Sequence, residues 1–215
     1  FSQSQVTTIG NGAFYTCPKL KSVIFNDQLQ SIGNQAFQYT AITSADFPES
    51  LTSIGQDAFY RSGLTSVYIP ASLTNIADGA FASNTQIEKF IVSPDNPNYT
   101  AGEDGILFTK DKKTLLLYPP ARPEEHYHVP EGTTAIANNA FDHCLLQSVN
   151  IATSVETIGT QAFSFASNLE SVSFETPSQI KTFGGQIFYS CTSLKSFTIP
   201  PSLESGGSQP FFWLA

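Results

Sequence analysis

Two histidines and two acids near the middle of the chain are residue types that occur in metal sites. His126 and His128 alternate around Tyr127, so on an extended strand both side chains face the same side, and Glu124 and Glu125 precede them. Imidazole and carboxylate groups bind divalent transition metals. A solvated surface pair accounts for the same residues without any ligand. We therefore expect no metal here and no bound cofactor elsewhere.

A second set, Asp142-His143-Cys144, contains the side-chain types of a nucleophilic triad. Catalysis by such a set requires the acid, the base and the nucleophile to converge in space, whereas three consecutive residues point in different directions. The sequence also shows no phosphate-binding loop and no recognisable frame of paired carboxylates. It indicates no catalytic residues, and we expect the protein not to be an enzyme.

These residues are embedded in a repeat that ends in Ala-Phe. Copies such as Ile-Gly-Asn-Gly-Ala-Phe recur at steps of 23, 22, 22, 60, 22 and 25 residues, and end at Phe14, Phe37, Phe59, Phe81, Phe141, Phe163 and, in a weaker form, Phe188. An eighth copy begins at Leu203 and stops before its strand. Self-similarity at such a period predicts a solenoid.

A second motif follows each Phe and has the alternating apolar pattern of a strand. Leu20-Lys-Ser-Val23-Ile-Phe25 and Leu64-Thr-Ser-Val67-Tyr-Ile69 are two of its copies. One strand and one turn cannot bury their own apolar face, so the copies must stack at roughly 4.8 Å per strand around a shared core. We predict a β-rich leucine-rich-repeat solenoid, a parallel strand ladder with short helical turns and 22–23-residue repeats.

The consensus Leu-x-x-Ile-Gly-x-x-Ala-Phe-x-x-Cys-x-x-Leu-x-Ser-Val-x-Ile-Pro resembles the BspA-like leucine-rich repeat over nearly the whole chain outside a central insert. The resemblance implies large surface proteins of anaerobic bacteria and of some parasitic protists, several of which are implicated in attachment to host proteins and cells. It therefore implies an extracellular location at the cell surface. The family is a scaffold class, so the ligand does not follow from it.

The expected organisation is a single continuous solenoid with one insert. Repeats 1–4 occupy residues 1–92, a β-hairpin insert 93–133, and repeats 5–8 residues 134–215, with the last repeat truncated. Residues 106–118 read as two short strands around a charged turn at residues 110–113. The hairpin either packs on the solenoid as a structural element or protrudes as a contact element. Because neither end shows a complete polar cap, we expect the chain to be a fragment.

Three cysteines occupy one column of the repeat, three residues after a repeated Phe. Cys144 and Cys191 are two repeats apart, which places them about 10 Å apart by strand spacing. That separation exceeds the reach of a disulfide, which ends near 7 Å between Cα atoms. We expect Cys17, Cys144 and Cys191 to be small packed residues and neither disulfide-bonded nor zinc ligands.

The outward side of the predicted strands is the candidate partner-binding face. The residue after each central apolar position varies in chemistry, whereas the residue before it is almost always Ser. The variable row, which we call the outward row, consists of Ile24, Asp46, Tyr68, Ile91, Asn150, Ser173 and Thr198. Solenoids use such extended faces to bind partners, and Tyr68 beside Ile24 and Ile91 offers an aromatic anchor. Ordinary surface scatter explains the row equally well.

Charge and hydropathy narrow the partner class. The net charge is −8 and the isoelectric point is near 4.7, so an acidic surface repels nucleic acid. No apolar run approaches 18 residues, so we expect no membrane insertion. The leading hypothesis is a cell-surface module that binds or adheres to a host or cell-surface protein. The alternatives are a structural spacer of a larger surface protein and a glycan-binding module that uses Asp46, Tyr68 and Asn150.

Overall fold

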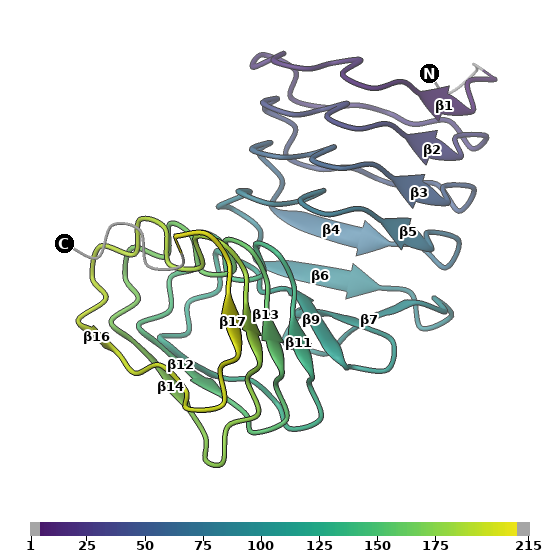
Figure 1. Ribbon diagram of the computed structural model, residues 1–215. Coiled ribbons are helices and arrows are strands. Elements are labelled where there is room, and N and C mark those ends of the chain that lie inside the picture. Colours follow the sequence, from purple (N-terminus) through teal and green to yellow (C-terminus); the bar gives the residue numbers. More distant parts are fainter. Residues whose placement is uncertain (1–4, 210–215) are drawn as a thin grey trace. The chain divides into compact units, whose positions relative to one another are not determined.

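The computed structural model describes residues 5–209 and divides into two compact units, residues 1–105 and 106–215. Each unit is a stretch of β-solenoid in which successive coils pair through parallel strands (Figure 1). The predicted last repeat extends into residues 210–215, which lie outside the described part of the chain. Several coils contain two strands, as with β3 Ser53–Ile54 and β4 Ser66–Ile69, where the sequence motifs predicted one.

The first unit contains two parallel ladders. Strands β1 to β3 and β5 form the first, and each ends at the Ile that lies five residues before a repeated Phe. The strands are β1 Thr8–Ile9, β2 Ser31–Ile32, β3 Ser53–Ile54 and β5 Asn75–Ile76. The second ladder pairs β4 (Ser66–Ile69) with β6 (Lys89–Val92), and β7 spans Tyr99–Ala101. The segments around Val23 and Ala45, predicted as strands, are not strands here.

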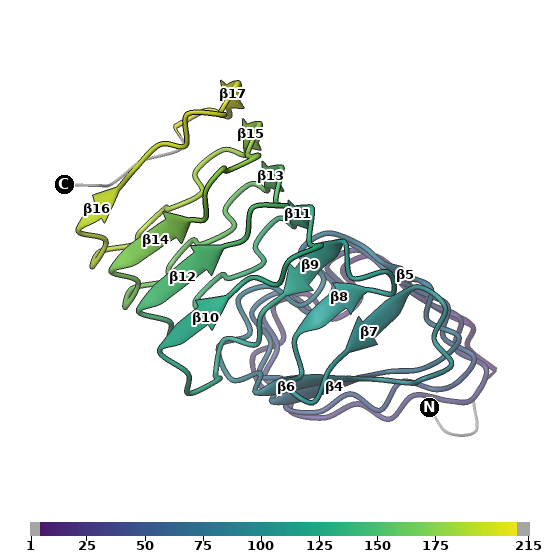
Figure 2. The ribbon, with the colours of Figure 1, turned by 90° about the horizontal axis from the view of Figure 1, so that it is seen from below.

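The second unit has longer ladders (Figure 2). One contains β10 His126–His128, β12 Ser148–Ile151, β14 Ser171–Phe174 and β16 Ser196–Phe197, in that order. The other contains β8 Leu107–Thr109, β9 Thr114–Leu117, β11 Ala135–Ile136, β13 Thr157–Ile158, β15 Thr182–Phe183 and β17 Ser205–Gly206. Strands β8 and β9 are antiparallel and form the predicted hairpin, and β9 also pairs in parallel with β11.

The repeated phenylalanines form the centre of each core. Their rings stack from coil to coil, with centroids 5.1 Å apart for Phe37 and Phe59 and 4.8 Å apart for Phe141 and Phe163. All four side chains have no exposed area. Stacked pairs of this kind add about 0.5–1.5 kcal/mol each beyond the burial of their area. The strand residues Val67, Val149 and Val172 are buried beside them, as the alternating pattern predicts.

The Ala-Phe segments are turns and not the short helices that we predicted; the described residues contain no helix. In successive coils the residues two before and two after the Phe adopt left-handed φ values, as at Gln35 (56°) and Tyr39 (57°) around Phe37. A left-handed residue on each side of the Phe prevents a continuous right-handed helix. The backbone N–H groups instead donate to the following coil, as in Phe37 N to Ala58 O at 2.7 Å and Tyr39 N to Tyr60 O at 3.0 Å.

A degenerate coil lies within the predicted insert. Leu115 pairs with Ile136 in the ladder, the Tyr118 ring stacks on Phe141 with centroids 5.4 Å apart, and Tyr118 N donates to Ala140 O at 2.7 Å. Leu115 and Tyr118 therefore take the places of the repeat's Ile and Phe. The hairpin thus leads directly into the ladder of the second unit.

Candidate binding face

The outward row of the first unit presents apolar side chains to solvent. Tyr68 on β4 is directly opposite Ile91 on β6. The two side chains are 40% and 44% exposed, and Ile24 is 70% exposed. Asp46, in the intervening coil, is also exposed. Large apolar side chains that remain this accessible on neighbouring coils contribute little to the core, so their chemistry is available to a partner.

The outward row of the second unit is a hydrogen-bonded polar network. His128, Asn150 and Ser173 are opposite one another on β10, β12 and β14. Ser173 Oγ donates to Asn150 Oδ1 at 3.1 Å, and Asn150 Nδ2 donates to Glu175 Oε1 at 3.3 Å. His128 Nε2 lies 3.6 Å from the same carboxylate oxygen. Thr198, the last residue of the row, is exposed beyond the end of β16.

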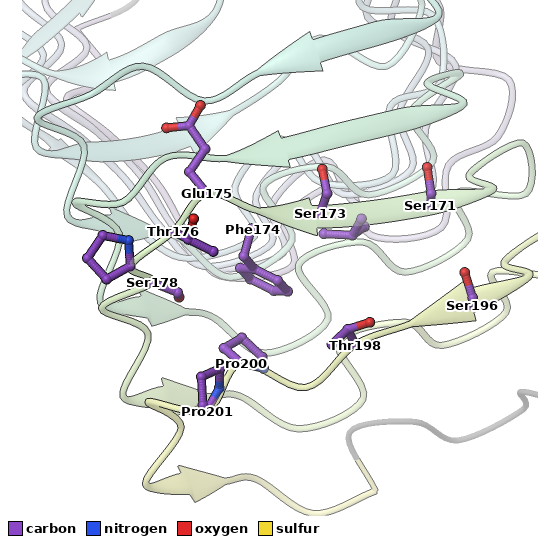
Figure 3. Close-up of a pocket in the computed structure, with 12 residues that line it drawn as sticks. Ser171, Ser173, Phe174, Glu175, Thr176, Ser178, Ser196, Thr198, Pro200 and Pro201 are labelled. Carbon is purple, nitrogen blue, oxygen red and sulfur yellow. The ribbon is translucent and has the colours of Figure 1, made fainter.

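A cavity of about 470 Å³ opens beside this network (Figure 3). It lies between β14 with the segment that follows it and β16 with the segment that follows that strand. Its lining consists of Ser171, Val172, Ser173, Phe174, Glu175, Thr176, Pro177, Ser178, Ser196, Thr198, Pro200 and Pro201. The volume is within the range of small-ligand pockets. The outward-row residues Ser173 and Thr198 are on its walls.

The serine positions that precede the outward row form part of the same surface. Ser148, Ser171 and Ser196 are directly opposite one another, and His126 occupies that position on β10. His126 Nδ1 lies 2.8 Å from Ser148 Oγ. The two histidines of β10 therefore face the same side of the sheet, as the alternation predicts, and each contacts a polar residue of β12. Among residues 5–209 no three His, Cys, Asp or Glu side chains gather closely enough to hold a metal ion.

Asp142 and His143 interact, but Cys144 is buried in the core. Asp142 Oδ1 accepts a hydrogen bond from Ser164 Oγ at 2.7 Å and lies 3.0 Å from His143 Nδ1. Burial raises the pKa of the Cys144 thiol to about 12, so at neutral pH the sulfur is protonated and is not a nucleophile. Burial likewise raises the pKa of Cys191 to about 12. All three cysteines are free.

Sequence reasoning missed two surface features. Glu175 and the prolines of the cavity lie outside the outward row; the only sign of them was the 25-residue step to Phe188. An aromatic edge also runs along the turns of the first unit, where the Tyr39 centroid is 5.9 Å from that of Tyr15 and 5.8 Å from that of Tyr60. These rings meet edge to face and partly cover one another, so they form no flat platform.

Comparison with known protein families assigns the repeat. Residues 2–100 and 124–213 match the model of the BspA type leucine-rich repeat region, in six copies. The chain belongs to this family. The BspA-type match omits residues 101–123, which contain β8, β9 and the degenerate coil. No curated protein matches the chain.

Three solved structures resemble this BspA-type chain. The pneumococcal vaccine antigen PcpA aligns with a TM-score of 0.81 and 26% identity over 94% of the chain. A leucine-rich cell surface protein from Faecalibacterium prausnitzii aligns with a TM-score of 0.73 and 27% identity, also over 94%. The chain spans 56% and 66% of those proteins. A leucine-rich repeat protein from Eubacterium ventriosum aligns with a TM-score of 0.70 and 22% identity. The alignment covers 98% of this chain and 77% of that one, and it supports the fold alone.

No helix long and apolar enough to cross a bilayer occurs among residues 5–209.

Proposed function

We propose that this chain is the binding module of a bacterial surface protein and that it adheres to a host or cell-surface protein through its outward row. The observation that carries the proposal is the exposure of Ile24, Tyr68 and Ile91 on the outward side of the first unit, where packing does not require apolar residues. Interfaces obtain most of their binding energy from a few such anchors, with tyrosine prominent among them. The proposal is of a binding protein and not of an enzyme.

Two further observations support a location at the cell surface. The structurally similar proteins include a vaccine antigen and a cell surface protein. The described coils also expose many Ser, Thr, Asn and Gln side chains and few charges: only 13% of all residues are charged. That share is about half the usual one for a globular chain, so contacts at the face itself would depend mainly on apolar and uncharged polar side chains.

The test measures binding of the fluorescently labelled chain to intact epithelial cells and to immobilised matrix proteins. A Tyr68→Ser, Ile91→Ser double variant removes two adjacent anchors, and we expect it to bind at least roughly tenfold more weakly than the wild type. Because both side chains are exposed, its thermal stability should change little.

Leu145→Ser is the matched control. Leu145 is 47% exposed in the segment between the Phe141 turn and β12, so its replacement removes a similar apolar area away from the outward row. We expect this variant to bind like the wild type. If the wild-type chain binds neither cells nor matrix proteins, the adhesion proposal fails and a spacer role replaces it. Equal loss in both variants would mean that adhesion is nonspecific.

A further inference from the structure

The cavity in the second unit lies where the pairing of two neighbouring coils ends. The ladder between β14 and β16 extends to the pair Val172 and Phe197 and then stops. Eleven positions separate Val172 from Phe183 on β15, compared with nine between Val149 and Ile158 one coil earlier. The two extra residues move the segment after β14 away from its neighbour.

Phe174, the last residue of β14, directs its main-chain N–H and C=O toward this gap. Glu175 N donates to Ile151 O at 2.9 Å, on the β12 side of the strand. The C=O of a trans peptide points opposite to its N–H, so the carbonyl of Phe174 points away from β12. In an extended strand the N–H and C=O of one residue share a side, so the Phe174 N–H points the same way.

Neither of these two groups is paired. The register of the ladder places Pro200 where the donor to Phe174 O would be, and proline has no N–H. The second bond of a continued ladder, Phe174 N to Thr198 O, is also missing, whereas the corresponding bond from Val129 N to Asn150 O forms at 2.9 Å. Among residues 5–209 the N–H and C=O of Phe174 have no hydrogen-bond partner. They form an open ladder edge one residue long.

The space beside this edge is apolar and receives no charge. The Phe174 ring points between the two coils, with Pro200 and Thr198 on the opposite side (Figure 3). Of the described residues that line the cavity, Glu175 alone is charged. Its carboxylate points away from Phe174 and accepts a hydrogen bond from Asn150 at 3.3 Å (Figure 3). An occupant of the cavity must therefore be uncharged, because a charge buried there would have no counter-charge.

We propose that this cavity binds an extended segment of a partner protein with an uncharged apolar residue at its centre. That residue would donate its N–H to Phe174 O and accept from Phe174 N, as two opposite residues do in an antiparallel hydrogen-bonded pair. A peptide suits the site better than a small apolar molecule, because its main chain offers both a donor and an acceptor. Addition of a strand to an open sheet edge is a general mode of peptide recognition.

The pairing also sets the pattern of side chains in the bound segment. Residues directly opposite each other place their side chains on the same face, so the central side chain lies beside the Phe174 ring. Its two neighbours point to the other face, where the hydroxyl groups of Ser173 and Thr198 border the cavity. The expected pattern is polar, apolar, polar. The inference rests on the proposed function, in that the chain binds a partner protein, and it names a peptide site on the second unit.

The direct test titrates the isotopically labelled full chain with the peptide acetyl-Gly-Thr-Ser-Leu-Ser-Thr-Gly-amide and follows the Phe174 amide by NMR. We expect this resonance to move to lower field and to saturate, because its N–H gains an acceptor. A matched peptide with N-methylated leucine keeps the side chain and loses the donor; it should bind at least roughly tenfold more weakly. A peptide with serine in place of leucine should be weakened at least as much. Equal affinity of the leucine and N-methyl-leucine peptides would overturn the proposal, as would an unmoved Phe174 resonance.

Proline variants locate the site. Pro200→Ala supplies the missing N–H opposite Phe174 O, so the ladder can extend into the gap; peptide affinity should fall at least roughly tenfold. Pro201→Ala is the matched control, because it replaces the adjacent proline of the same cavity without placing a donor opposite Phe174. It should bind the leucine peptide like the wild type. The amide spectra of both variants show whether the fold is intact. Equal affinity of the two folded variants would refute the role of the Phe174 main chain.

Failure of this inference differs from failure of the proposed function. If cells bind the wild-type chain but the leucine peptide does not bind, adhesion stands and the cavity is not a peptide site. If the peptide binds with the expected preference but neither cells nor matrix proteins bind, the cavity is a peptide site and the adhesion proposal fails.

Discussion

The two units contain the same inward column and different outward rows. In the first unit Phe59 stacks between Phe37 and Phe81, and in the second Phe163 stacks between Phe141 and Phe188. Outside these matched cores, the first unit exposes Ile24, Tyr68 and Ile91, whereas the second joins His128, Asn150 and Ser173 through hydrogen bonds and close polar contacts. The repeat thus constrains one side of each strand and leaves the other free to vary.

That difference indicates where selection for binding can act without cost to folding. A change at the inward column alters stacks above and below it, since each ring contacts two others. A change in the outward row of the first unit alters only solvent-exposed surface. The second unit is intermediate, because its outward residues hold one another and the Glu175 carboxylate in place. Substitutions in the two units should therefore differ in a graded way.

The largest loss of folding stability should come from substitutions in the two cores, and it should be equal in both units. Phe59→Ala and Phe163→Ala each remove a fully buried ring that stacks on two neighbours, so each should reduce the free energy of unfolding by about 3–5 kcal/mol. Urea unfolding followed by circular dichroism measures this. A loss confined to one variant would contradict the equivalence of the two cores.

Substitutions in the outward rows should have a smaller effect on folding stability, and this effect should differ between the two units. Asn150→Ala breaks the contacts to Ser173 and Glu175 and should lower the free energy of unfolding by about 1 kcal/mol. Tyr68→Ala, at the corresponding position of the first unit, should change it by less than about 0.5 kcal/mol. The comparison uses urea midpoints of the two variants side by side. Equal destabilisation would show that the first unit's row also contributes to folding.

The smallest effect on folding stability should come from the charge of an acidic residue in the turns. Asp57 and Gln161 both lie two residues before a repeated Phe, and Gln161 Nε2 donates to Gln186 Oε1 at 3.2 Å. Partial burial, followed by the charge of Asp78, raises the pKa of Asp57 above its ordinary 3.8. Because the folded-state pKa of this acid is raised, its ionised form destabilises the fold at neutral pH. The penalty diminishes as the pH falls through the raised value and is gone below 3.8.

Asp57→Asn should therefore raise the melting temperature by roughly 1–2 °C at pH 7. The gain should disappear below the ordinary pKa of the acid, where both side chains are neutral. Gln161→Asn, which introduces no change of charge, is the control for side-chain shape and should show no such pH dependence. A gain of equal size at pH 3 and pH 7 would mean that charge is not its cause.

The sequence predicted the features that depend on the period of the repeat. The inward position of Val67 and Val149 and the outward position of Tyr68 follow from alternation along a strand. The degenerate coil was missed because Leu115 and Tyr118 are three residues apart, whereas Ile136 and Phe141 are five apart. Its identity depends on the ladder and the ring stack and not on its own spacing.

Other features depend on backbone geometry that side-chain patterns do not reveal. Small residues before each Phe are consistent with a helical turn, but the left-handed residues two before and two after it direct the N–H groups out of the coil. The cavity required both the two extra residues after Val172 and the end of pairing at Phe197. The sequence shows the first of these as a longer step, and Pro200, which cannot donate to a ladder, indicates the second.

The turn bonds give one edge of each unit an electrical polarity, whereas ladder bonds such as Gly33 N to Ile9 O donate to the preceding coil. Around Phe37 and around Phe141 every second N–H group donates to the following coil, so the dipoles of these peptides point the same way along the stack of turns, as they do in an α-helix. The positive pole lies toward the coils of higher residue number, the reverse of the helix convention along the chain. A carboxylate beside the turn of the last coil of a unit should therefore be stabilised, and so should a lysine beside the turn of the first.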